Sequence, residues 1–284
     1  MSNSKPHENP LVPNKRLREI YTLMSEARAL DDFAVQAATR AKVAFKSTRG
    51  EEACRVSTAI GLGSGDLISD SHESVVMHMI TGGSVHSLLR RLDTILARKL
   101  PSQTRPQKIA PLPWTKNALT RLTMATGAAA SIKATRRPNL VMAYAQSRDL
   151  SDAEWSSLLK IAAEMELPII FVVLPGHGNR NLCALAHKLG LPGFPVDADD
   201  AVALYRVAQE SIGRARGDGS AVLIECHTLR PSHGHEAQNG PIPLMQKFLL
   251  DRKVSGKTWL NGVGRAYQKH LEAERRAQRQ RIQR

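Results

Sequence analysis

The chain has 284 residues, of which 42% are hydrophobic, so it is long enough to bury a substantial core. Its formal net charge is +14 at pH 7, and aromatic residues make up only 4% of it. A positive charge attracts anions, but nucleic-acid modules usually combine basic with aromatic residues, so nucleic acid is not the favoured partner. The three cysteines, at positions 54, 183 and 226, are far apart and predict free thiols in a reducing compartment.

The amino terminus and the hydropathy pattern predict a cytoplasmic protein that does not bind membranes. The first residues contain no apolar segment of the kind that forms a signal peptide. No run approaches the roughly 18 apolar residues that span a bilayer. Residues 1–13 contain three prolines and little apolar content, so we expect this segment to be disordered.

The positive charge is unevenly distributed along the chain. Between Thr94 and Arg148 there is no Asp or Glu, whereas ten Lys and Arg residues fall in this span. The last twenty residues carry seven Lys and Arg against two Glu. These stretches are interpreted either as solvated basic faces or as a surface that docks an acidic protein.

The first half of the chain predicts mostly helices. A long helix is expected over about 14–39, a second from Gly50 to about residue 61, and two short ones over 74–79 and 85–96. The glycine cluster from 61 to 65 is interpreted as a turn, because no strand precedes it and no Gly-Lys-Ser/Thr follows. Residues 66–71 are expected to be a short connection. Residues 98–118 form a Pro-rich basic loop, whose prolines exclude regular structure.

The second half predicts strands that alternate with helices. Expected strands are 140–145, 169–174, 193–197 and 221–227, each a short run with β-branched or apolar residues. Between the first two, Ser151 and Glu154 form the S-x-x-E pattern of a capping box. The helix that follows should bury one face, made of Trp155, Leu158, Leu159, Ala162 and Met165.

Further helices complete this half. A small-residue helix is expected over 122–133, a short one over 182–189, and one whose amino terminus is capped by Asp199 or Asp200. Two more, over about 244–253 and 258–281, end the chain.

Together these elements predict an α/β fold, a parallel sheet with helices on both faces and with helical arms at both ends. The α/β domain should occupy residues 14–240, and residues 241–284 should form the C-terminal helices with a basic tail. Because ligands of open parallel sheets bind at the carboxyl ends of the strands, we look for function at residues 146–149 and 175–180.

Seven short segments resemble those of one known family, in its order and at about its spacing. The family is the α subunit of the thiamine-diphosphate-dependent 2-oxo acid dehydrogenases, the decarboxylating component of pyruvate dehydrogenase and its branched-chain relatives. The resemblance covers roughly residues 15 to 270. The segments are residues 16–28, Gly50-Glu-Glu-Ala53, Gly65-Asp66, Ala125-Thr-Gly-Ala-Ala-Ala130, Leu167-Pro-Ile-Ile-Phe-Val-Val173, Asp197-Ala-Asp-Asp-Ala-Val202 and Pro241-Ile-Pro-Leu-Met-Gln-Lys-Phe-Leu-Leu250.

The resemblance implies an oxidoreductase subunit with the thiamine-diphosphate-binding fold, which binds the cofactor through Mg²⁺ and shares its active site with a β-type subunit. Mg²⁺ prefers hard oxygen ligands, which the family supplies with a Gly-Asp-Gly and an Asn-Asn segment. In this chain those positions read Ala145-Gln146-Ser147 and Pro175-Gly176, and the family's Tyr-Arg pair at the diphosphate reads His72-Glu73. We therefore predict no metal ligand and expect impaired binding of cofactor and metal.

Other positions that correspond to the family's site keep polar side chains. Thr228-Leu-Arg230 matches the family's Thr-Tyr-Arg, and Ser232-His-Gly-His235 resembles its His-Gly-His. Asp149 is a possible replacement ligand, although helix N-terminal capping is the favoured explanation for it, and a loop position between glycines is favoured for His177. The candidate catalytic residues are His233 and His235, and the candidate cofactor-binding residues are Gln146, Ser147, Asp149, His177 and Arg230.

Three hypotheses for the function remain open at this point. In the first, the chain is a pseudoenzyme with a structural or regulatory role, in a hetero-oligomer with a β-type subunit or in association with itself. In the second, it is a working subunit for oxidative decarboxylation of a 2-oxo acid, which holds thiamine diphosphate with altered ligands. In the third, it is a basic binding module without enzymatic activity.

Overall fold

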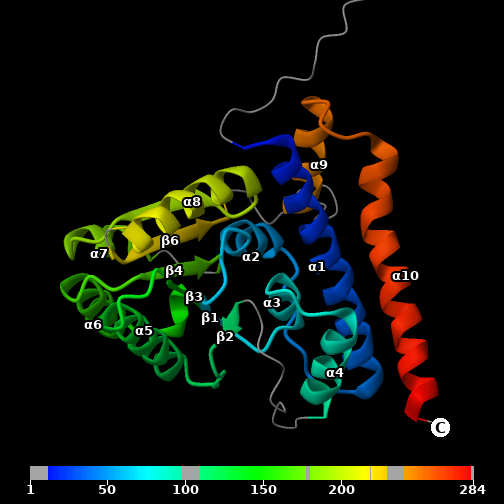
Figure 1. Ribbon diagram of the computed structural model, residues 1–284, viewed down its shortest axis with the longest axis horizontal. Helices are drawn as coiled ribbons and strands as arrows, with labels where there is room; N and C mark the ends of the chain where they lie inside the picture. Colours follow the sequence, from blue (N-terminus) through cyan, green and yellow to red (C-terminus); the bar gives the residue numbers. More distant parts are fainter. Residues whose placement is uncertain (1–11, 98–108, 177–179, 218, 229–239, 283–284) are drawn as a thin grey trace, which may run out of the picture.

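The computed structural model describes residues 12–97, 109–176, 180–217, 219–228 and 240–282. At its centre lies a six-stranded sheet in which all neighbouring strands are parallel (Figure 1). The strands lie in the order β2-β1-β3-β4-β6-β5. They are β1 (Leu67–Ser69), β2 (Ala110–Pro111), β3 (Val141–Gln146), β4 (Ile169–Leu174), β5 (Gly193–Asp197) and β6 (Val222–His227).

Both faces of the sheet are buried, which is why its central strands are continuous apolar runs. Side chains alternate along β3, so that Met142 and Tyr144 join the hydrophobic cluster on one face. Val141, Ala143 and Ala145 join the cluster on the other face. The predicted α/β fold with helices on both faces is therefore confirmed.

The helices divide between the two faces. The cluster that contains Val141 is covered by α5 (Ala118–Ala134), α6 (Asp152–Glu164) and α7 (Leu182–Lys188). The opposite cluster involves the remaining helices (Figure 1). These are α1 (Asn14–Ala41), α2 (Glu52–Ala59), α3 (Val75–Ile80), α4 (Val85–Leu96), α8 (Ala201–Gly217), α9 (Pro241–Asp251) and α10 (Lys257–Ile282).

Most of the predicted elements are confirmed within a few residues of their bounds. The capping box of α6 forms with both of its hydrogen bonds, between Ser151 and Glu154. Asp200 caps α8, because its side chain accepts hydrogen bonds from the backbone N–H groups of Val202 (3.0 Å) and Ala203 (2.9 Å). The cysteines are free, as predicted, and all three are buried.

Four expectations were wrong in detail. Residues 66–71 are not only a connection, since β1 pairs with both β2 and β3. The loop over 98–118 contains the two-residue strand β2, which tolerates Pro111 because it lies at the edge of the sheet. Met165 is 49% exposed, because α6 ends one residue before it. Val12, expected in the disordered terminus, is fully buried beside the start of α1. Residues 1–11 lie outside the described residues.

The two ends of the described chain pack against each other as parallel neighbours, α1 and α10 (Figure 1). The guanidinium of Arg18 donates to the carbonyl oxygen of Val254 at 2.6 Å, and the hydroxyl of Tyr21 donates to that of Leu260 at 2.8 Å. Tyr21 also accepts a hydrogen bond from the side chain of Gln246 at 2.6 Å. The helical arms are therefore joined by specific polar contacts in addition to apolar packing.

Asp66, at the start of β1, connects three parts of the fold. Its fully buried carboxylate accepts hydrogen bonds from the backbone N–H groups of Gly63 (2.7 Å) and Leu140 (3.0 Å). It also forms an ion pair with Arg216 on α8. One carboxylate thus fixes the glycine turn, the start of β3 and the end of α8, so its loss would leave the buried N–H of Leu140 and two half-buried donors without this acceptor.

We expect Asp66→Ala to lower the free energy of unfolding by about 3 kcal/mol, because the N–H groups of Gly63 and Leu140 and the guanidinium of Arg216 lose a buried acceptor. Urea denaturation followed by circular dichroism measures this change. Asp152→Ala, which removes a carboxylate that is 81% exposed, is the matched control and should change the stability by less than about 0.5 kcal/mol. Equal effects of the two variants would contradict the role given to Asp66.

Candidate functional site

The order of the strands reverses between β1 and β3. The chain passes from β1 outward to β2 on one side, and from β3 to β4 on the other. In open parallel sheets, ligands bind outside the carboxyl ends of the strands at such a point. Here, Asp70, Ser71 and His72 follow β1, and the short 3-10 helix η1 (Ser147–Asp149) follows β3.

The guanidinium of Arg55, on α2, is the centre of a buried polar cluster at this edge. It is inaccessible to solvent and forms ion pairs with Glu51 at 2.8 Å and with Asp70 at 2.6 Å. It also donates to the hydroxyl of Ser71 at 3.0 Å, and lies 5.7 Å from the centroid of the Tyr144 ring. Burial opposes the charge, but the two carboxylates outweigh it and raise the pKa of Arg55 above its usual value.

His72 and Asp70 each keep one buried atom, Nε2 and Oδ2 respectively, without a hydrogen-bond partner among the described residues. Both residues line a small cavity of about 40 Å³, which Trp114 also lines. Burial would raise the pKa of Asp70, but the charge and the hydrogen bond of Arg55 outweigh burial and hold this pKa below its usual range. Burial, together with the neighbouring charge of Arg55, lowers the pKa of His72 to about 3. His72 is therefore a neutral imidazole with one free nitrogen.

At the end of β3, the polar side chains bind one another. The side-chain oxygen of Gln146 accepts a hydrogen bond from Arg148 at 3.1 Å. The carboxylate of Asp149 accepts the backbone N–H of Gln146 at 2.9 Å and lies 3.5 Å from the guanidinium of Arg121. Burial lowers the pKa of Arg121, although the charges of Asp149 and Asp70 act in the opposite direction. The two carboxylates therefore offset only part of the cost of burying this guanidinium.

These residues do not fit a divalent cation. Mg²⁺ needs several free oxygen ligands, but the side-chain oxygen of Gln146 and Oδ2 of Asp149 already accept hydrogen bonds, and both residues face guanidinium groups. Within the described ranges, no group of three or more His, Cys, Asp and Glu side chains is placed to hold a metal. The side-chain chemistry at this edge therefore disfavours a diphosphate bound through Mg²⁺.

Only part of the predicted site can be placed. Gln146, Ser147 and Asp149 lie together at the end of β3, where the carbonyl of Ser147 accepts hydrogen bonds from Trp155 (2.9 Å) and Arg180 (2.9 Å). The other candidates lie outside the described residues, namely His177, Arg230, His233 and His235.

The roles of Arg55, Asp70 and Arg121 were not predicted from the sequence. One signal was available for Arg55, because Glu51 precedes it by one helical turn, a spacing at which opposite charges attract. Nothing in the local sequence indicates that Asp70 reaches the same guanidinium, since that contact depends on the pairing of β1.

One family model and several known proteins are similar to this chain. A family model described as "Dehydrogenase E1 component" matches residues 176–243. The human mitochondrial 2-oxoisovalerate dehydrogenase subunit alpha is 22% identical over 245 residues, which is 80% of this chain and 55% of the relative. The 3-methyl-2-oxobutanoate dehydrogenase subunit alpha of Mycobacterium tuberculosis (strain ATCC 25618 / H37Rv) is 24% identical over 242 residues, or 77% of this chain and 62% of the relative.

A third relative is the chloroplastic pyruvate dehydrogenase E1 component subunit alpha-3 of Arabidopsis thaliana, 28% identical over 173 residues, 49% of this chain and 40% of the relative. The chain thus resembles the α subunits of the 2-oxo acid dehydrogenases, as the sequence segments predicted. It spans between 40% and 62% of the length of these three relatives. Among the described helices, none combines the length and the apolar character needed to cross a membrane.

The neutral state of His72 predicts a pH dependence of stability. Its pKa of about 3 in the folded protein lies below the ordinary value of 6.5, so the unfolded chain takes up a proton first as the pH falls. Stability is therefore unaffected by His72 above about pH 6.5 and falls below it, by up to about 1.4 kcal/mol per pH unit.

We expect His72→Gln to remove this contribution, so that its unfolding free energy depends less steeply on pH between about 6 and 4 than that of the wild type. Urea denaturation at several pH values gives both slopes. His187→Gln, which alters an exposed imidazole on α7, is the matched control. A wild-type slope in His72→Gln would show that His72 is not neutral in the folded protein.

Proposed function

We propose that the chain is an α-type subunit of an assembly related to the 2-oxo acid dehydrogenases, in which binding of thiamine diphosphate and Mg²⁺ is impaired. In this proposal its role is structural or regulatory. The partner is a β-type subunit or a second copy of the chain, since the three relatives described above are themselves alpha subunits.

One observation carries this proposal. The residue at the position of the family's metal-binding carboxylate is Gln146, and its only side-chain oxygen accepts a hydrogen bond from Arg148. A divalent cation placed there would meet two nearby guanidinium groups, those of Arg148 and Arg121, at a site with little free anionic charge. Repulsion between cations at such distances costs several kcal/mol at an effective dielectric constant of about 20, so Mg²⁺ would bind poorly.

A second candidate function rests on Asp149. Its carboxylate is 22% exposed at the carboxyl end of β3, three residues beyond Gln146. If Arg121 moved away, this carboxylate could supply the missing oxygen ligand, and the chain would then be a working subunit for oxidative decarboxylation. The proposal of an impaired site and this alternative differ in whether Mg²⁺ promotes cofactor binding.

Isothermal titration calorimetry with thiamine diphosphate, with and without Mg²⁺, tests the two functions. The full chain is used in complex with its co-purified β-type partner, because the family's site lies between two subunits. For the impaired site we expect no Mg²⁺-dependent heat at cofactor concentrations up to about 1 mM. The dissociation constant is then above about 1 mM, which corresponds to a binding free energy weaker than about −4 kcal/mol.

Dissociation constants near micromolar that require Mg²⁺ would contradict the proposal and favour the working subunit. In that case Asp149→Asn should abolish the metal dependence. Asp152→Asn, which alters an exposed carboxylate paired with Arg180 at 3.1 Å, is the matched control and should leave it unchanged.

A further inference from the structure

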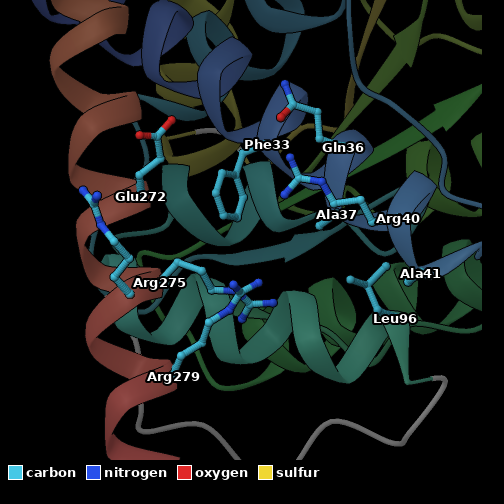
Figure 2. A pocket seen from close by; sticks show the side chains of 10 residues that line it. Phe33, Gln36, Ala37, Arg40, Ala41, Leu96, Glu272, Arg275 and Arg279 are labelled. Atoms are coloured by element: carbon cyan, nitrogen blue, oxygen red, sulfur yellow. The ribbon is translucent and has the colours of Figure 1, made fainter.

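A pocket formed by helices alone lies away from the strand ends, between α1, α4 and α10 (Figure 2). Its volume is about 470 Å³, within the range of sites that bind small molecules. Arg40 comes from α1, and Arg275, Arg276 and Arg279 come from α10. We call it the α1–α10 pocket.

The arginines of this pocket are not all compensated. Arg275 binds Asp93 through two contacts, of 2.6 Å and 2.7 Å. Arg40, Arg276 and Arg279 have no ion pair or side-chain hydrogen bond with any other described residue, and Glu272 is the one carboxylate among the lining residues. Guanidinium groups held in one concave site repel each other, and an anion between them would remove that repulsion.

The two ends of the pocket differ in chemistry because α1 and α10 run in parallel. Arg279 lies at one end, where the side chains of Arg275 and Arg279 extend from α10 toward α4 (Figure 2). Phe33 and Glu272 lie at the other end, and Arg40 extends from α1 toward Phe33, between the two ends. An adjoining cavity of about 280 Å³, which Phe33, Glu272 and Arg40 also line, continues along the same two helices.

Each end selects a different part of a ligand. Guanidinium groups match the geometry and the charge of phosphate oxygens better than those of a single carboxylate, because a phosphate group offers several acceptors and close to two negative charges. The ring of Phe33 offers an apolar face for stacking. The carboxylate of Glu272 is an acceptor for an amine or a hydroxyl group.

We propose that the α1–α10 pocket binds an organic phosphate, a small molecule in which a phosphate group is joined to a ring that carries hydrogen-bond donors. The phosphate lies between Arg40 and Arg279, and the ring lies against Phe33 with its donors directed to Glu272. This site is independent of the proposed subunit function, because it shares no residue with the edge of the sheet.

Calorimetry on the full chain with ATP as the probe tests this site, with inorganic triphosphate as a probe that has three linked phosphates, at least as much negative charge and no ring. We expect ATP to bind at least about tenfold more tightly than inorganic triphosphate, because only ATP contacts Phe33 and Glu272. Arg40→Gln and Arg279→Gln should each weaken ATP binding by about tenfold or more, since each removes a charge-assisted hydrogen bond.

Lys269→Gln is the matched control, because it removes one positive charge from an exposed position of α10 that does not line the pocket. It should change ATP affinity by less than about twofold. All three side chains are exposed, so we expect the substitutions to leave the melting temperature unchanged. Thermal unfolding of each variant checks that it folds. An equal loss in Lys269→Gln and Arg279→Gln, or equal affinity for ATP and inorganic triphosphate, would overturn the proposal and leave a nonspecific basic surface.

Thiamine diphosphate is itself an organic phosphate, so the two calorimetric tests must be kept apart. Binding of thiamine diphosphate that is independent of Mg²⁺ and is lost in Arg279→Gln belongs to the α1–α10 pocket. Binding that requires Mg²⁺ and survives this substitution belongs to the edge of the sheet. That result would contradict the proposal of an impaired cofactor site and would leave the proposal for the α1–α10 pocket standing.

Discussion

The charge of Arg55 is the constraint on which the carboxyl edge of the sheet depends. A guanidinium without any access to solvent is stable only if its neighbours replace the water that it loses. Glu51 and Asp70 provide this compensation from two sides, one from the same helix and one from the turn after β1. The geometry of α2 relative to β1 is therefore fixed by electrostatics as well as by apolar packing.

Hydrogen bonds and ion pairs also join polar side chains farther along this edge. Gln146 accepts a hydrogen bond from Arg148, and Asp149 accepts one from the backbone of Gln146 and forms an ion pair with Arg121. Other buried atoms here have no hydrogen-bond partner among the described residues, namely Nε2 of His72, Oδ2 of Asp70 and Nε of Arg121. His72 and Asp70 line a cavity of about 40 Å³, so part of this edge is satisfied internally and part is not.

The sequence predicted the fold well wherever the signal was local. The apolar runs of β3 and β4, the capping box at Ser151 and the helical stripes each depend on residues close in sequence. It failed at β1 and β2, which have three and two residues and become strands only through pairing with β3 and with each other. Segments this short carry no periodicity, so tertiary contacts decide their conformation.

The candidate site was predictable to a smaller degree, for the same physical reason. The position of Gln146 at the end of a buried strand could be anticipated, and so could the capping role of Asp149. The convergence of Arg55, Asp70 and His72 could not, because an ion pair across α2 and β1 leaves no pattern in either segment. The α1–α10 pocket was foreseen only as a basic tail, since α1 and α10 are more than two hundred residues apart in sequence.

That separation has a consequence for how the chain is made. The hydrophobic stripe of α1 leaves the ribosome more than two hundred residues before the partners of Arg18 and Tyr21 at Val254 and Leu260. During that interval part of the apolar surface of α1 is uncovered, a condition that favours aggregation or capture by chaperones. α10 can dock onto α1 only after the intervening chain has been made.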